Sequence, residues 1–238
     1  MTFPKYSITP LGTHIDGGFG AMADSFMKAA QNLSQDEDKS FSNKHLPTNF
    51  LYRHAIELYL KSIIIVVHSS LGLAYGPHSE PHILLIKSNN WCPITKVHSV
   101  KDLYQYFEAL MSQNQQAIID ITHNNWADIP SELKDAIVDV AKVDDTSTYF
   151  RYPSMKDDQA NNHKSAWQET RSVEINKSNT TKDRPIKVFV EVNDQDEVEH
   201  IYKFNFDPIE KISKSVQTAA TILQGAHLGL RVELANGN

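Results

Sequence analysis

The stretch NFLYRHAIELYLKSIIIVV, residues 49–67, decides the fold of this chain. Its apolar positions predict a helix, and its second half is apolar on nearly every side, which is typical of a central helix covered by several neighbours. Charged side chains on a nearly buried helix are costly unless they are paired. Four polar residues nevertheless lie in its first half: Arg53, His54, Glu57 and Lys61.

Two interpretations of these residues are open at this point. Arg53, Glu57 and Lys61 are spaced four apart, so they share one helix face and could form a solvated salt ladder worth about 0.3 kcal/mol per pair. Alternatively, the polar residues form a site. The rest of the chain has to decide between them.

Composition restricts the class of protein. The chain has 238 residues, 40% hydrophobic and 22% charged, which is ordinary for a soluble protein with a substantial core. No apolar run is long enough to cross a bilayer and the start shows no export signal, so we expect a cytoplasmic protein without a membrane partner. The net charge of −6 disfavours general binding to nucleic-acid backbone, although a few converging basic groups could still bind RNA or a nucleotide.

Cofactor and metal signatures are weak, and we predict neither. Cys92 is the only cysteine, which excludes an internal disulfide and a cysteine-based zinc site. His78 and His82 have the spacing of a metal pair, but Pro81 lies between them and no HExxH pattern is present. The glycines of HIDGGFG lack the spacing of a nucleotide-binding loop, so we interpret them as the lead-in to a helix.

Helical periodicity and capping signals predict most of the remaining elements. Helices are expected after HIDGGFG, from Pro47 or Thr48 to Leu71, and from Ser99, where Asp102 can complete a capping box. HILLI could form a short strand. Another helix is expected after the MSQNQQ interruption, in AIIDI, and one follows Pro130.

The last third of the chain combines strands with a long helix. IKVFVEV and HIYKFNF alternate as strands do and flank an acidic turn, so we expect an antiparallel hairpin at about residues 184–206. Asp207, Pro208 and Glu210 then predict a helix start. The stripe along this last helix should pack on a neighbour, in the same chain or in a partner. We therefore expect a mainly α protein with one domain over residues 1–238, its helical core at about 17–153 and 207–230.

Three motifs in this order resemble a known family. RHAxELxLK on the central helix, VHSVKDL at the start of the next, and FRYP after a further helix are similar to a branch of the HEPN superfamily of bacterial helical domains. The resemblance implies a helical bundle, often a homodimer. In many relatives it also implies RNA cleavage without a metal, in toxin–antitoxin or phage-defence systems.

The resemblance also implies a set of site residues. The active nucleases carry Arg, four to six residues, then His, and no pair in this chain has that spacing. The polar set of this branch does match: Arg53, His54, Glu57, His98 and Arg151. As a hypothesis, the arginines would hold a phosphate, a histidine would move a proton and Glu57 would orient a partner.

The alternative is a non-catalytic module. In it, Glu57 pairs with Arg53 or Arg151 and the polar cluster fixes the FRYP loop to the bundle. Such a module would bind RNA, a nucleotide or a cognate protein, or would serve in oligomerisation. The geometry of the five residues decides between these hypotheses.

Overall fold

A computed structural model describes residues 6, 8–35, 43–152, 164–170 and 187–237 of the chain. Its helices and strands are η2 (Leu11–Thr13), α1 (Phe19–Gln35), α2 (His45–Leu71), β1 (His82–Leu85), β2 (Asn90–Pro93), η3 (Ile94–Lys96), α3 (Val100–Gln113), α4 (Gln115–Ile121), α5 (Ser131–Asp144), β3 (Trp167–Glu169), β4 (Val188–Val192), β5 (Val198–Phe204) and α8 (Asp207–Ala235). The protein is thus mainly α-helical with two small antiparallel sheets.

The chain divides into two compact units. The helical unit comprises Met1–Tyr152 and Ser213–Asn238, and the sheet unit comprises Pro153–Ile212. The hairpin expected at residues 184–206 falls within the sheet unit, and the first turn of α8 belongs to that unit as well.

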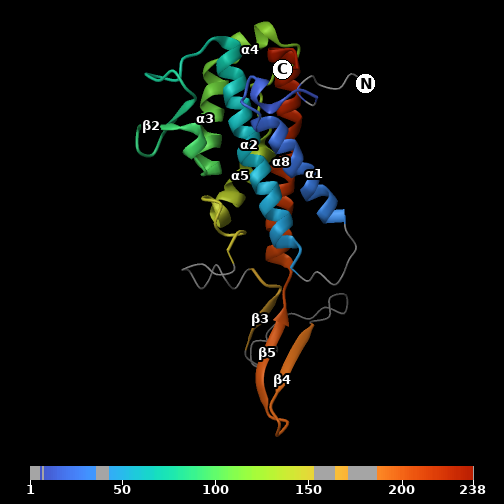
Figure 1. The fold of residues 1–238 in the computed structure, drawn as a ribbon. Helices are drawn as coiled ribbons and strands as arrows, with labels where there is room; N and C mark the ends of the chain where they lie inside the picture. Colours follow the sequence, from blue (N-terminus) through green and yellow to red (C-terminus); the bar gives the residue numbers. More distant parts are fainter. Residues whose placement is uncertain (1–5, 7, 36–42, 153–163, 171–186, 238) are drawn as a thin grey trace. The chain divides into compact units, whose positions relative to one another are not determined.

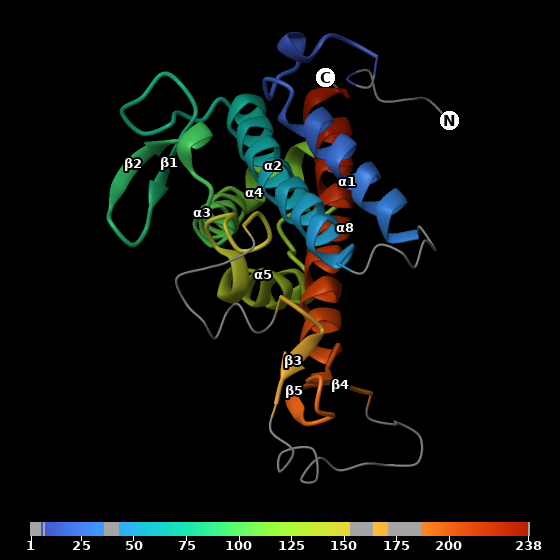
Figure 2. The ribbon, with the colours of Figure 1, turned by 60° about the horizontal axis from the view of Figure 1, so that its bottom comes forward.

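The central position of α2 follows from its sequence. Every residue from Ala55 to His68 is buried, so this helix has no wet face over that length. In the helical unit α2 lies between α1 and α8 on one side and α3 on the other, as two views show (Figures 1 and 2). The helix ends where expected, because Gly72 adopts the left-handed conformation with φ of 63° and closes the last turn.

The cap predicted at the start of α3 is confirmed, whereas α2 begins at His45, ahead of the expected Pro47 or Thr48, and has no side-chain cap. The Ser99 hydroxyl accepts a hydrogen bond from the Asp102 amide at 3.0 Å and so caps α3. Leu103, Phe107 and Leu110 are buried on its inner face, as the periodicity predicted. Helix α3 ends at Gln113, and α4 begins at Gln115. This agrees with the interruption expected in MSQNQQ.

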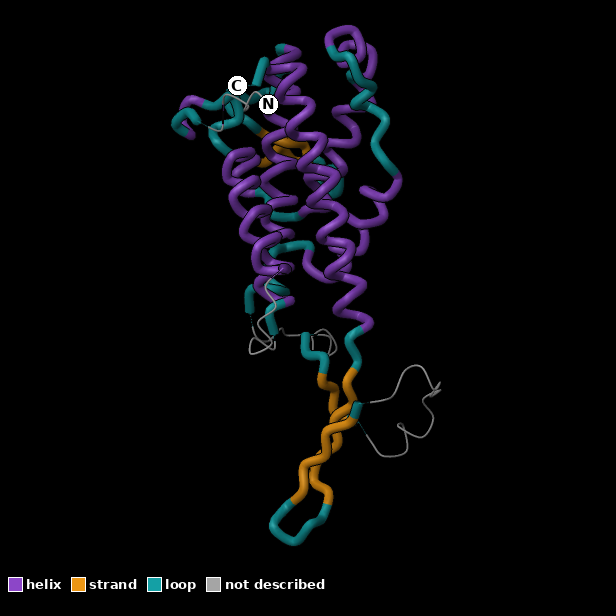
Figure 3. The backbone as a smooth tube through the Cα atoms, turned by 90° about the vertical axis from the view of Figure 1, so that its right-hand side faces the viewer, coloured by secondary structure: helices purple, strands orange, loops and turns teal. Residues whose placement is uncertain are grey.

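Two strands were not predicted. The possible strand in HILLI is present as β1, but its partner β2 was not expected; Ile83 lies opposite Cys92. The hairpin of β4 and β5 is confirmed, and β3 joins it to give the order β3-β5-β4. Both unpredicted strands are only three or four residues long, too short to show an alternating pattern. Figure 3 shows the three strands twisting about one another.

The stripe on α8 packs within the same helical unit. Val216, Ala219 and Leu223 are buried there, so these positions are not left open for a partner. Among the helices in the described residues, none combines the length and the apolar character that a membrane span requires.

Candidate functional site

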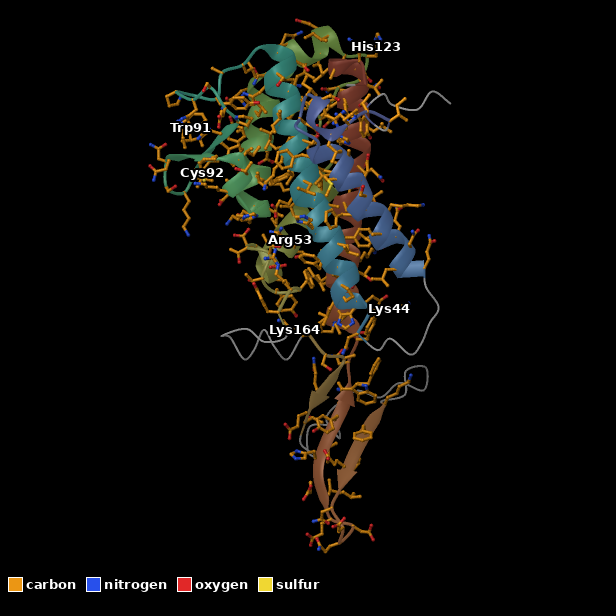
Figure 4. All side chains as sticks on the ribbon, viewed as in Figure 1. Lys44, Arg53, Trp91, Cys92, His123 and Lys164 are labelled. Carbon is orange, nitrogen blue, oxygen red and sulfur yellow. The ribbon has the colours of Figure 1, made fainter. Side chains whose placement is uncertain are left out.

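Arg53 occupies the centre of the polar cluster, and its guanidinium is completely buried at 0% exposure. Each of its three nitrogens donates a hydrogen bond. Nη1 donates to Glu57 at 2.5 Å, Nε to the carbonyl of Asp144 at 3.3 Å, and Nη2 to the carbonyls of Asp145, at 2.9 Å, and His98. Figure 4 shows Arg53 between α2 and the end of α5. Arg53 therefore satisfies carbonyls that the end of α5 leaves without helical partners.

Glu57 and Lys61 continue the same buried network. The Lys61 ammonium donates to Oε1 of Glu57 at 2.8 Å and lies 5.8 Å from the centre of the Phe19 ring. Lys61 is only 2% exposed, and Glu57 is buried as well. The interpretation as a solvated salt ladder is therefore wrong: the pairs at four-residue spacing exist, but α1 and the neighbouring segments cover them.

The electrostatic balance favours a charged Glu57. Burial alone would raise the pKa of this carboxyl, but Lys61, Arg53 and the hydrogen bond from His98 outweigh it and hold the pKa below its ordinary value. Glu57 is thus a carboxylate that pairs with two buried cations, and the buried Asp144 carboxylate lies 3.9 Å from Nε of Arg53. We name this set, Arg53, Glu57 and Lys61, the buried clamp.

His98 is the exposed member of the network. Its Nδ1 lies 3.0 Å from Oε1 of Glu57, while 58% of its side chain is exposed. Its main-chain carbonyl is bound by Arg53, which fixes the segment just before α3. The Asp145 carboxylate adds a further tie, since it accepts from the Ser99 hydroxyl at 2.8 Å.

His54 and Arg151 lie outside the hydrogen-bonded network. The His54 ring stacks on Phe50 at 5.9 Å and meets the Phe26 ring edge-on at 4.4 Å. Burial lowers its pKa below the ordinary value, an effect that Glu57 opposes, so we infer a neutral imidazole. Arg151 is exposed, lies 5.6 Å from the centre of the Phe50 ring and donates to the Ser147 hydroxyl.

The loop that leads into FRYP is hydrogen-bonded to the end of α5. One carboxylate oxygen of Asp144 accepts from the amides of Thr148 and Tyr149, at 2.6 and 2.9 Å, and Tyr149 and Phe150 are buried. Arg53 thus joins the central helix to the segment at His98 and to the end of α5, and Asp144 connects the end of α5 to the loop that leads into FRYP. In this arrangement Arg53 has no open face for a phosphate, because its side chain is covered and its nitrogens are engaged.

A second buried cluster was missed by the sequence analysis. Asp16 Oδ1 accepts from the amide of Gly18 at 3.0 Å, and Oδ2 accepts from the amide of Gly20 at 2.8 Å. The same Oδ2 accepts from the Ser62 hydroxyl at 2.5 Å and from Nη1 of Arg231 at 2.7 Å. These hydrogen bonds outweigh burial, which alone would raise the pKa of Asp16, and hold it below the ordinary value. The glycine lead-in therefore serves a structural ion pair between the start of α1 and the end of α8.

Aromatic and histidine side chains surround that ion pair. The Arg231 guanidinium lies 4.2 Å from the centre of the Tyr6 ring, and Tyr6 and Tyr59 both donate to the Asp24 carboxylate, at 2.7 and 2.6 Å. His227 is fully buried beside them, and burial lowers its pKa to about 4. Among the described residues, this cluster is a buried polar centre apart from the one at Arg53.

One signal in the sequence could have found this cluster. His227 and Arg231 are four residues apart in the last helix, on a face that otherwise reads as apolar, and such pairs share one helix face. Their partner Asp16 lies 215 residues away, and no local pattern connects the two.

The sheet unit has the opposite character. The register places Trp167 opposite Phe204, and Tyr202 opposite Phe189, so four aromatic rings share one face of the sheet. Their ring centres lie 5.2 to 6.4 Å apart. Phe189 is 56% exposed and Trp167 44%. We name these four residues the aromatic face.

The histidine pair considered for a metal is stacked ring on ring. The ring centres of His78 and His82 lie 3.8 Å apart with the planes at 10°. Within the residues that the structure describes, no group of three or more His, Cys, Asp or Glu side chains is arranged to hold a metal ion.

Comparison of the chain with protein-family models, with curated proteins and with solved structures finds no match. The assignment of function therefore rests on the geometry described above.

Proposed function

We propose that the protein is a non-catalytic HEPN-like module that acts by binding a protein partner through its sheet unit. The observation that carries this proposal is the aromatic face, because contiguous exposed aromatic side chains are typical of protein–protein contact surfaces. In the helical unit, the buried clamp serves as scaffold.

The charges next to the aromatic face indicate the kind of partner. The turn end of the hairpin carries Glu191, Asp194, Asp196, Glu197 and Glu199, whereas the cations Lys203, on β5, and Lys187, 5.5 Å from the centre of the Phe204 ring, lie further from the turn. An acidic surface repels nucleic-acid phosphates, so base stacking on these rings is disfavoured. It attracts a basic protein surface, and the partner should combine apolar and basic side chains.

Co-purification from cells of the source organism, after cross-linking, tests this proposal. Wild type is compared with Phe189→Ser, which removes an exposed ring, and with Val232→Ser, which removes a similarly exposed apolar side chain from α8. We expect a basic protein that wild type and Val232→Ser retain and Phe189→Ser loses, with retention falling as salt rises. Equal recovery by all three proteins would contradict the proposal.

One observation favours a second candidate function, a metal-independent ribonuclease of a toxin–antitoxin or phage-defence system. The half-exposed His98 imidazole lies on the Glu57 carboxylate, an arrangement in which a carboxylate can orient a general base. Purified protein incubated with total RNA in a chelator tests it. Cleavage that His98→Ala abolishes and Arg151→Ala weakens would favour the nuclease, and intact RNA would favour the binding module.

A further inference from the structure

A cavity of about 670 Å³ lies in the helical unit between the β1–β2 hairpin and the helices α2 and α3. Leu84 and Ile86 line it from the hairpin side, Leu110 and Gln113 from α3, and Trp91 from β2. Trp91 packs closely on the backbone of Gly76, where a Cβ atom would come within 2.2 Å of the ring. Figure 4 shows Trp91 on this hairpin. Neither the polar network around Arg53 nor the aromatic face uses this space.

A histidine–tyrosine pair forms the polar part of the cavity wall. Nδ1 of His68 lies 3.3 Å from the carbonyl oxygen of Leu73, and Nε2 lies 2.9 Å from the Tyr106 hydroxyl. A carbonyl oxygen only accepts, so Nδ1 carries the hydrogen and Nε2 accepts the hydrogen of Tyr106. Burial lowers the pKa of His68, which agrees with this neutral form.

The direction of these hydrogen bonds restricts what the cavity can hold. Because the Tyr106 hydroxyl hydrogen is committed to His68, its oxygen can only accept from a molecule in the cavity. Among the described residues that line the cavity, none is Asp, Glu, Lys or Arg, so a charged ligand would lose its hydration without compensation. Most of the remaining wall is aliphatic, with the Trp91 indole on one side and the amide side chains of Gln113 and Asn114 at the end of α3.

We propose that this cavity binds a small, uncharged, flat aromatic molecule whose N–H or O–H group donates a hydrogen bond to the Tyr106 hydroxyl. Apolar walls with one oriented polar contact are the usual composition of a small-molecule site. The volume of about 670 Å³ accommodates a ligand of one or two rings with space to spare. None of the residues that line the cavity belongs to the aromatic face.

A matched pair of probes tests the proposal on the wild-type chain. Indole carries the donor, and 1-methylindole lacks it at nearly the same size and apolar character. In NMR titrations of nitrogen-15 labelled protein, indole should shift the side-chain peak of Trp91, which the Trp91→Phe variant identifies. We expect half-saturation near about 1 mM for so small a ligand, and about tenfold weaker binding of 1-methylindole.

Two variants assign the effect to the cavity. Tyr106→Phe removes the acceptor and should make the two probes bind equally. Ala74→Phe at the exposed rim should obstruct both probes. The proposal is overturned if neither probe shifts the cavity peaks, or if wild type binds both equally. It is also overturned if those peaks depend on protein concentration alone, which would make the cavity a contact between copies.

Discussion

The helical unit and the sheet unit place their side chains in opposite ways. Arg53, Glu57 and Lys61 are buried inside the helical unit, although they are the residue types most often found in water. Phe189 and Trp167 in the sheet unit are half exposed, although aromatic residues usually cover a core. In both units, residue type alone gives the wrong location.

Charged side chains are buried in the helical unit and aromatic side chains are exposed in the sheet unit for different physical reasons. The buried cations are tolerated because the carboxylates of Glu57 and Asp144 and three backbone carbonyls replace the water that Arg53 and Lys61 lose. The exposed rings belong to a sheet of three short strands, which offers too little area to cover both of its own faces. In the described residues, the helical unit encloses these charged side chains, and the sheet unit leaves Trp167 and Phe189 half exposed.

Removing the centre of the buried clamp should have the largest effect. Arg53→Ala leaves Lys61 paired with Glu57 but removes the donors to the carbonyls at the end of α5 and before α3. We expect the free energy of unfolding to fall by about 3–5 kcal/mol, measured by urea denaturation. Arg151→Ala is the control, because this arginine is exposed. It should change the free energy of unfolding by less than about 0.5 kcal/mol. Similar values for the two variants would show that the clamp does not stabilise the unit.

Acidification should weaken the helical unit through His227. Its pKa is about 4 in the folded chain against an ordinary 6.5, so between these values the unfolded chain binds more protons. Above pH 6.5 His227 is neutral in both states and does not reduce the free energy of unfolding. As the pH falls to 4, protonation of the unfolded chain lowers the free energy of unfolding by about 3 kcal/mol in total. Chemical denaturation at a series of pH values measures the slope. The slope should be shallower in His227→Gln, and an unchanged slope would show that His227 is not the cause.

The second polar centre can be tested with a matched pair of glycines. A Cβ atom on Gly20 would come 2.2 Å from Nε2 of His227 and 2.9 Å from Nη1 of Arg231, whereas one on Gly225 would meet nothing within 4 Å. Gly20→Ala should therefore destabilise the protein by about 1–3 kcal/mol. Gly225→Ala, in the exposed part of α8, should stabilise it by about 0.5–1 kcal/mol. Thermal unfolding should give shifts of opposite sign, and shifts of the same sign would contradict the close packing at Gly20.

The smallest effect is expected on the aromatic face. Phe189→Ser removes an exposed ring and a cross-strand contact, which should cost about 0.5 kcal/mol or less. Phe107→Ala on α3 removes a buried ring and should cost about 3–5 kcal/mol. Denaturation midpoints of the two variants measure this difference. A large loss for Phe189→Ser would mean that its ring contributes to a core rather than to a contact surface.

Local rules in the sequence predicted the elements but not their burial. Ser99, Gly72 and the periodicity of α2 and α3 act over a few residues, so the helices could be placed without the structure. The spacing of Arg53 and Glu57 was equally visible. Whether α1 and the segment at His98 cover that pair depends on contacts across tens of residues, which local periodicity does not contain.

The ion pair of Asp16 with Arg231 and the enclosure of Arg53 also depend on contacts between distant segments of the chain. Asp16 and Arg231 form an ion pair across nearly the whole chain, and the sequence offered only the spacing of His227 and Arg231 as a sign of it. The HEPN resemblance grouped three motifs, and in the structure Arg53 of the first motif bonds to the carbonyl of His98 in the second and to carbonyls at the end of α5, ahead of the third. It did not indicate that Arg53 would be fully enclosed.

Most hydrogen-bond partners of Arg53 are distant from it in the sequence, and this affects the order in which the contacts can form. Its hydrogen-bond partners lie 4, 45, 91 and 92 residues away, so the guanidinium can be enclosed only after two long loops have closed. The α1–α2 pair, by contrast, joins segments that follow each other closely in the chain. Closure around Arg53 therefore belongs late in folding, and its loss should speed unfolding much more than it slows folding. Arg53, which the sequence suggests as a catalytic residue, is therefore expected to complete its contacts in a late step of folding.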